Sequence, residues 1–140
     1  MTRPKKIKTD CHIFLLGKAY QRGHHLVQNR LKPYGLTNAQ YVVLEVLWQE
    51  AGITAVKIGK LLRMDKASLS GILDRMAESG WILKQQDDRD LRMIRIYPSE
   101  KADGLKETLI EERRKANEEL LSGFTVEEKV LLRRMLLDMV

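Results

Sequence analysis

Apolar positions near the start of the chain recur every three or four residues, which is the spacing of one face of a helix. From about residue 10 this face consists of Ile13, Leu16, Tyr20, His24, Val27 and Leu31. Pro33 and Gly35 follow directly, and both residue types commonly mark the end of a helix. The pattern therefore predicts a long first helix, preceded by a basic tail at residues 1–9.

Two later helices begin with a capping box, in which a Ser or Thr is followed three residues on by Glu or Gln. Thr37 and Gln40 form this pair ahead of an apolar helix at residues 40–48. Thr125 and Glu128 form it ahead of the last helix of the chain. In each pair we expect the hydroxyl to accept from a backbone N–H and the longer side chain to accept in return.

The middle of the chain predicts two short helices joined by a tight turn. Thr54 is the expected N-cap of a helix at residues 54–62, and Asp65 is the expected N-cap of a second at residues 66–79. Gly80 supplies the C-terminal stop. These are the proportions of a helix-turn-helix, whose second helix enters the major groove of DNA.

Beyond the second of these helices the spacing changes from helical to alternating. Residues 81–86 and 93–97 predict two short strands around the charged segment 87–92, which makes a hairpin. Ser99 then opens another long helix, which runs to about residue 123. The expected fold class is mainly α with a small β-hairpin wing, a winged helix-turn-helix.

The helices at the two ends of the chain are expected to pack against a partner chain. Eight of the eleven residues at 130–140 are apolar, whereas a surface helix of a small monomer needs an apolar stripe of only roughly 100°. A second copy is the simplest cover, because twofold dimers are the commonest oligomers. We therefore expect a single domain over residues 1–140, with dimerisation helices at 10–36 and 99–140 around a DNA-binding lobe at 37–98.

Composition narrows the class of protein. At 140 residues with 44% apolar content the chain is long and apolar enough to fold as one domain. No apolar run exceeds four residues, so no membrane span and no membrane partner are expected. The single cysteine cannot form an internal disulfide, which favours a reducing cytoplasm.

The net charge of +6 favours a polyanionic partner. Its distribution is uneven, because residues 1–36 hold eight basic residues against one acidic residue. The predicted DNA-binding region, residues 54–97, holds nine basic against six acidic residues. General attraction to DNA therefore resides mainly in the basic tail and the first helix, and a few side chains of the lobe are expected to place the protein on its site.

A helix that reads a groove needs a small, polar N-terminal end that can approach base edges and phosphates. Here that end consists of Lys66, Ser68, Ser70 and Gly71, on the face away from Leu69. A lysine at a helix start opposes the helix dipole, which favours a functional reason for Lys66. We also count Thr54, at the start of the preceding helix, among the candidate DNA-binding residues.

Three segments resemble the MarR family of winged helix-turn-helix regulators. They are YGLTNAQYVVL at residues 34–44, DKASLSGILDRMAESG at residues 65–80, and the wing segment DRDLR at residues 88–92. The resemblance covers about residues 10–140. It implies a homodimer that binds a pseudo-palindromic operator, usually as a repressor, with half-sites about one helical turn (~10 bp) or a multiple of it apart. It also implies a small-molecule effector bound between the dimer region and the lobes.

The resemblance assigns roles to individual positions. Ser68 and Ser70 stand where family members contact bases and phosphates, and Arg75 stands where a basic side chain reaches the DNA backbone. Arg89 stands near the wing tip that enters the minor groove, Arg92 takes the second arginine position of the wing segment, and Asp90 orients one of them through a salt bridge. The alternative for Arg75 is a solvated face shared with Asp74 and Glu78.

The chain departs from the family pattern at two places. Gly71 sits where many members carry arginine or another polar residue that reads bases, so a base-reading side chain is not expected at that position. After the wing, where the family usually has a leucine-threonine pair, this chain has Tyr97, Pro98 and Ser99. This difference alters the start of the next helix.

Cys11 supports an alternative, a redox-sensing regulator. Some relatives that sense organic hydroperoxides use a single reactive cysteine near the start of the first helix, held by tyrosines. Here the residue one turn on is Leu15, and Tyr20 is more than two turns away. The spacing therefore favours a cysteine without a sensing role.

No cofactor or metal is expected. The adjacent His24 and His25 project about 100° apart on a helix and do not chelate together, and His24, on the apolar face, is expected to lie in the core. The sequence shows no nucleophile–base pair, phosphate loop or cysteine cluster, so an enzyme is not expected. The remaining alternative is a winged-helix module that binds proteins rather than DNA.

Overall fold

Five helices begin at a side chain that accepts a hydrogen bond from the backbone N–H three residues on. The computed structural model describes residues 6–140, so residues 1–5 of the predicted tail lie outside the described part. The five capping residues are Thr37, Thr54, Asp65, Ser99 and Thr125. Both predicted capping boxes are complete, with Gln40 and Glu128 accepting in return. Local hydrogen bonding thus fixes the helix starts where the sequence predicts them.

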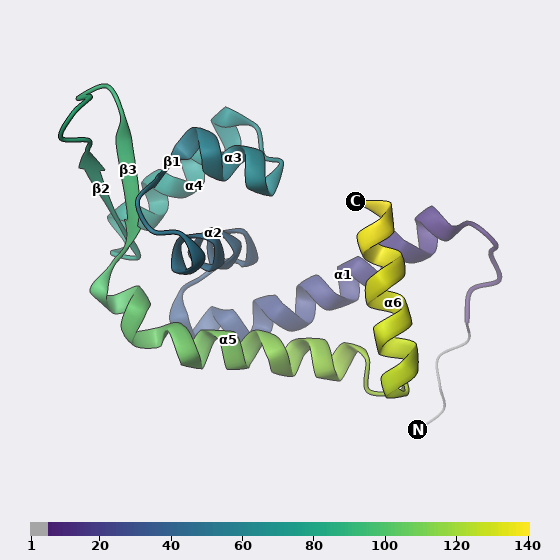
Figure 1. Cartoon of the computed structure of the whole chain (residues 1–140). Coiled ribbons are helices and arrows are strands. Elements are labelled where there is room, and N and C mark those ends of the chain that lie inside the picture. Colours follow the sequence, from purple (N-terminus) through teal and green to yellow (C-terminus); the bar gives the residue numbers. More distant parts are fainter. Residues whose placement is uncertain (1–5) are drawn as a thin grey trace.

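The elements follow the predicted order (Figure 1). They are α1 (His12–Leu31), the short 3₁₀ turn η1 (Lys32–Tyr34), α2 (Asn38–Gln49), β1 (Ile53–Thr54), α3 (Ala55–Leu62), α4 (Lys66–Glu78), β2 (Ile82–Gln86), β3 (Ile94–Pro98), α5 (Glu100–Leu120) and α6 (Val126–Met139). The predicted fold class, mainly α with a small β wing in a winged helix-turn-helix arrangement, is confirmed.

The sheet has a strand that the sequence pattern did not predict. β1 pairs antiparallel with β3, placing Ile53 opposite Ile96, so the order is β1-β3-β2. A strand of two residues is too short to show alternation, and its partner lies some forty residues away in the chain. Gly52 makes the junction possible, because its φ is 82° and a Cβ there would lie 3.0 Å from the Tyr97 ring.

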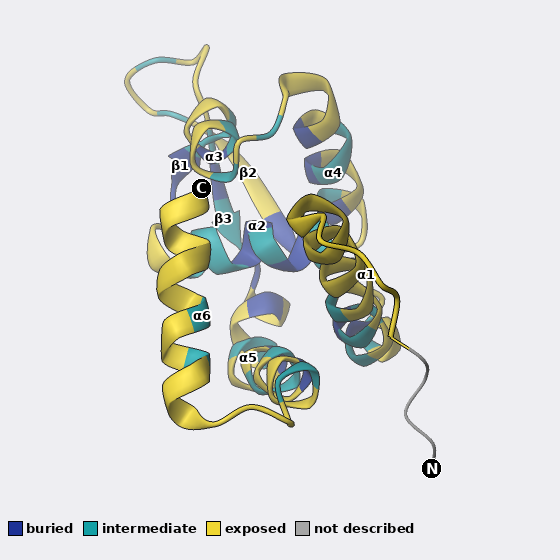
Figure 2. Ribbon diagram, turned by 90° about the vertical axis from the view of Figure 1, so that its right-hand side faces the viewer, coloured by how far each residue is buried: buried dark blue, intermediate teal, exposed yellow. Residues whose placement is uncertain are grey.

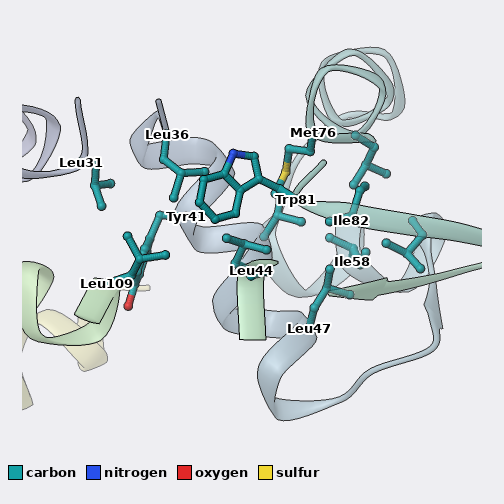
Figure 3. Close-up of a cluster of buried hydrophobic side chains, with 14 of the residues drawn as sticks. Leu31, Leu36, Tyr41, Leu44, Leu47, Ile58, Met76, Trp81, Ile82 and Leu109 are labelled. Atoms are coloured by element: carbon teal, nitrogen blue, oxygen red, sulfur yellow. The ribbon is translucent and has the colours of Figure 1, made fainter. Parts of the chain in front are cut away.

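The core lies where helices α2, α3 and α4 pack against the sheet. Trp81, only 1% exposed, occupies its centre, and Leu36, Tyr41, Leu44 and Met76 surround it (Figure 3). The core continues through Leu47, Ile58, Ile82 and Ile96, all of them buried. Burial of this cluster stabilises α2, α3, α4 and the base of the hairpin as one unit, because removal of apolar surface from water is the main driving force of folding.

The terminal helices form a second, longer layer. α1 and α5 run side by side (Figure 1), and they bury Val27 and Leu31 of α1 and Leu109 and Ala116 of α5. Arg30 adds ion pairs across this contact, with its Nη1 3.3 Å from an oxygen of Glu112.

The predicted apolar face of α1 is buried only near its C-terminal end. Ile13 is 82% and Tyr20 66% exposed. The expectation of a core histidine is wrong, because His24 is exposed and its ring lies 5.7 Å from that of Tyr20. No element of the described chain covers this half of α1.

α6 rises from the outer end of α5 and stands apart from α1, and none of its residues is buried (Figure 2). Leu131, Leu137 and Val140 are 48%, 54% and 79% exposed. Within the described residues, no helix combines the length and apolar character needed to cross a bilayer.

Candidate nucleic-acid interface

Close packing of α3 on α4 creates the helix-turn-helix. A Cβ at Gly59 would lie 3.3 Å from the carbonyl oxygen of Met64, so a glycine lets the turn approach α3. Arg63 in the turn has a φ of 52° and a ψ of 46°, the left-handed conformation that side chains disfavour. On α4, Leu69 and Leu73 are buried, which leaves the opposite face of the helix exposed to solvent.

The N-terminal end of α4 is built around Asp65. Its two carboxylate oxygens each accept a hydrogen bond from Ser68, one from the backbone N–H and one from the hydroxyl, both at 2.8 Å. These bonds hold the pKa of Asp65 below its usual value, the backbone bond contributing most. The hydroxyl proton of Ser68 is therefore already committed, and this side chain can only accept a further hydrogen bond from its surroundings. Lys66 and Ser70 are exposed beside it.

Arg75 lies further along the exposed face of α4. Its guanidinium folds back over Gly71, since a Cβ at Gly71 would lie 3.4 Å from Nη1 of Arg75. The neighbouring Asp74 pairs instead with Lys84 of β2, at 2.6 Å. Among the described residues Arg75 has no ion pair, so its charge is not neutralised by Asp74 or Glu78.

Thr54 has a structural position. Its hydroxyl accepts from the backbone N–H of Lys57 at 3.3 Å, and its backbone pairs with Arg95 in the sheet. Lys57 in turn pairs with Glu50 at 2.5 Å. Thr54 therefore links the start of α3 to the wing.

Asp87 organises the wing, a role that the sequence pattern did not indicate. One of its carboxylate oxygens accepts from the backbone N–H groups of Arg89 and Asp90, at 2.8 and 3.1 Å. The other accepts from Nε of Arg95 at 2.5 Å, while Nη1 of Arg95 donates to the carbonyl of Gly52 at 2.8 Å. The Arg95 hydrogen bond is the main cause that lowers the pKa of Asp87.

The tip of the wing presents two arginines. Asp90 accepts hydrogen bonds from both the backbone N–H and the Nε of Arg92, at 3.0 and 3.2 Å, and the Arg92 side chain remains 91% exposed. Arg89 is exposed and makes no ion pair within residues 6–140. Of the two arginines, Asp90 thus contacts Arg92, and both guanidinium groups remain accessible.

Most of these side chains gather on one lobe of the molecule. Figure 1 shows the hairpin of β2 and β3 together with α3 and α4 at the end remote from α6. Cys11, by contrast, immediately precedes α1 at the opposite end and is exposed (Figure 1). It takes no part in this surface.

The chain resembles known transcriptional regulators. The model of the MarR family matches residues 36–94. The HTH-type transcriptional regulator TtmR of Methylorubrum extorquens is 36% identical over 90 residues, which are 64% of this chain but only 43% of TtmR. The chain thus matches less than half the length of that relative. TtmR is named as a transcriptional regulator, not as an enzyme.

Two solved structures resemble nearly the whole chain. A probable transcriptional regulator from Pseudomonas aeruginosa has a TM-score of 0.88 at 27% identity, covering 94% of this chain and 98% of its own. A cysteine-to-serine mutant of MarR from E. coli, complexed with operator DNA, has a TM-score of 0.84 at 25% identity, with 91% of both chains covered.

Proposed function

The chain belongs to the MarR family, and from that premise we propose that it is a sequence-specific DNA-binding transcriptional regulator. The proposal has two copies of the chain on a pseudo-palindromic operator. Each copy inserts α4 into a major groove, while the wing contacts the adjacent minor groove. The lobe at residues 37–98 binds DNA and the helices at residues 10–36 and 99–140 hold the dimer together.

One observation carries the proposal. The exposed face of α4 and the arginines of the wing tip lie on one lobe, and the guanidinium groups of Arg75 and Arg89 have no acidic partner among the described residues. Exposed arginines without an acidic partner are suited to phosphates and base edges. The operator complex of the E. coli MarR mutant, similar along the chain, supports the same use.

A salt titration tests this proposal. We would select sites from random duplexes of about 30 base pairs, enough for two half-sites, and measure affinity over a range of salt concentrations. The logarithm of the affinity falls with a slope of about −0.9 per neutralised phosphate. We expect Arg89→Ala to weaken binding and to reduce the magnitude of the slope by about one contact.

Arg134→Gln is the matched control, because Arg134 is also exposed but belongs to α6, outside the lobe at residues 37–98. It should leave both affinity and slope unchanged. Equal affinity and slope for Arg89→Ala and the wild type would exclude the wing from the interface. A wild-type chain that enriches no sequence would favour the alternative, a winged-helix module that binds a protein.

A second copy of the chain is the proposed cover for the terminal helices. The groove between the end of α5 and α6, about 540 Å³, is lined mainly by apolar groups, including Leu121, Leu132 and Leu136. The exposed apolar half of α1 lies on the same end of the molecule (Figure 1). Two such surfaces on one chain suit a twofold arrangement in which each copy covers the other.

The proposal also covers whether the chain represses or activates transcription. We propose repression by operator occupancy, relieved when a small molecule binds near the junction of α1, α2 and α5. At this junction Arg113 of α5 pairs with Glu45 of α2 at 2.6 Å and lies over the ring of Tyr41. A ligand that separates α2 from α5 would change the spacing of the two lobes. Operator DNA lies in the cytoplasm, so the proposed activity belongs to that compartment.

A further inference from the structure

Gly71 is an unexpected residue at its position. It lies in the middle of α4, where glycine destabilises the helix because its helix propensity is lower than that of alanine. Its φ is not left-handed, since Gly35, Gly52 and Gly80 are the glycines with positive φ in the described chain. The backbone therefore does not require a glycine here, and the reason must lie in the space that a side chain would fill.

That space is occupied by the guanidinium of Arg75. A Cβ at Gly71 would lie 3.4, 3.8 and 3.9 Å from Nη1, Nη2 and Cζ of Arg75. All three atoms belong to the planar head group, so the guanidinium itself, rather than the aliphatic stem, lies over the glycine. A side chain longer than alanine at residue 71 would displace it.

This placement moves the charge along the helix. Side chains on a helix lean toward its N-terminus, and four residues of helix correspond to about 6 Å. The guanidinium of Arg75 thus lies at the level of Gly71, about one turn closer to Ser68 and Lys66 than its own Cα. The N-terminal part of a recognition helix is the part that contacts base edges.

The guanidinium is also free to bind. Asp74 is occupied by Lys84, and no hydrogen bond or ion pair of the Arg75 side chain exists within residues 6–140. The backbone carbonyl of Arg75 accepts from the N–H and hydroxyl of Ser79, at 3.0 and 2.6 Å, which fixes the helix from which the side chain extends. The wing arginines differ, since Arg92 is held by Asp90 and Arg95 by Asp87.

We propose that Arg75 is a base-reading residue, which donates two hydrogen bonds to the O6 and N7 atoms of a guanine through the space left by Gly71. This inference rests on the proposed function and revises the contact with the DNA backbone that family resemblance implies for Arg75. A planar guanidinium matches the two acceptors of guanine in the major groove, whereas adenine offers a donor at the corresponding position. One guanine in each half-site is therefore specified by Arg75.

The test compares specificity rather than affinity alone. Sites selected by the wild-type chain from random duplexes define the preferred base at each position, and Arg75→Ala is then measured on the selected site and on its guanine-to-adenine variants. We expect Arg75→Ala to abolish a preference of about 10- to 100-fold at one symmetric pair of positions. Preferences elsewhere and the salt slope should stay as in the wild type.

Gly71→Leu tests the role of the glycine. The leucine should displace the guanidinium and remove the same preference in the wild-type background, but change nothing at that position in the Arg75→Ala background. Such a double-mutant cycle separates this effect from a general clash with DNA. Gly71→Ala is the matched control, because its methyl group would be at ordinary contact distance from Arg75. It should keep the guanine preference and raise the melting temperature.

Two results would overturn the inference in different ways. Uniform weakening of all sequences by Arg75→Ala, with the salt slope reduced by about one contact, would assign Arg75 to a phosphate. Failure of the wild-type chain to select any sequence would remove the proposed function itself, and this inference with it. Circular dichroism melts of each variant confirm that the measured chains are folded.

Discussion

Arg95 and Asp87 join the tip of the wing to its base. The Nε atom of Arg95 lies 2.5 Å from a carboxylate oxygen of Asp87, and the same guanidinium donates to the carbonyl of Gly52. Asp87 in turn accepts from two backbone N–H groups of the tip. The conformation of the tip is therefore coupled, through two side chains, to the segment that leads into α3.

Replacing Arg95 should loosen the wing without removing a DNA contact. In Arg95→Met the Asp87 carboxylate loses its charged partner, so we expect faster amide exchange at residues 89 and 90 and weaker operator binding with a nearly unchanged salt slope. Hydrogen exchange and DNA titration measure the two effects. Arg92→Met is the control for stability, because an ion pair as exposed as Arg92 with Asp90 contributes little to folding. Unchanged exchange in Arg95→Met would contradict the coupling.

Acid should destabilise the lobe through Asp65 and Asp87. Both carboxyls have a pKa below the unfolded value because of the hydrogen bonds they accept. Their stabilising effect is complete above the unfolded pKa of about 3.9 and is lost as the pH falls through the folded pKa. Melting temperatures between neutral pH and pH 2 should therefore fall most steeply below about pH 4.

Asp65→Asn isolates the contribution of the helix cap. Asparagine caps a helix about as well as aspartate but does not titrate in this range. The variant should match the wild-type melting temperature near neutral pH and lose less stability in acid. An acid dependence identical to that of the wild type would show that Asp65 does not contribute to it.

Replacing Arg63 should stabilise the chain. Its left-handed backbone costs a residue with a Cβ about 1–2 kcal/mol, a cost that glycine avoids. Because glycine also gains freedom in the unfolded chain, we expect a net gain of about 0.5–1 kcal/mol for Arg63→Gly. Urea denaturation measures the gain, and Arg63→Asn should show a smaller one. A loss of stability would mean that the arginine side chain contributes to the fold.

A charge on α6 should dissociate the dimer. Leu137, which lines the groove beside α5 and is 54% exposed in the single chain, would be covered in the proposed dimer. We expect Leu137→Asp to sediment near the 16.2 kDa of one chain, and the wild type near twice that mass. Arg134→Gln, which changes a side chain paired with Asp138, should remain dimeric. A wild-type monomer would contradict the proposed assembly.

Peroxide should not act through Cys11. This thiol is exposed at the start of α1, and among the described residues no side chain donates a hydrogen bond to its sulfur. A sensing thiol needs groups that stabilise the thiolate. We therefore expect operator affinity after peroxide treatment to be the same in the wild type and in Cys11→Ser. Release from DNA that disappears in Cys11→Ser would establish the redox-sensing alternative.

Local chemistry explains why much of the fold could be predicted. The hydroxyl of Thr37 and the carboxylate of Asp65 bond to backbone groups only three residues away, so a short stretch of sequence contains both partners. The prediction that α6 packs against a second copy of the chain has the same origin, because an apolar belt along a helix is a property of one segment.

Contacts between distant segments explain what sequence patterns missed. β1 exists because Ile53 meets Ile96, and Arg95 matters because it reaches the carbonyl of Gly52, 43 residues earlier. Neither relationship leaves a periodic pattern in the sequence. The position of the Arg75 guanidinium over Gly71 was also not predicted. The sequence shows that the two residues are four apart, but it does not show the direction of the arginine side chain.

In the proposed dimer, the lack of any buried residue on α6 of the single chain makes protein concentration a determinant of folding. A helix that buries its apolar side chains only against a second molecule gains its stability from a bimolecular step, which strengthens with concentration. The melting temperature of the chain should therefore rise as the protein is concentrated. In a cell, dilute chains would lose part of their structure as well as their partner, so occupancy of an operator would fall more steeply than in proportion to the amount of protein.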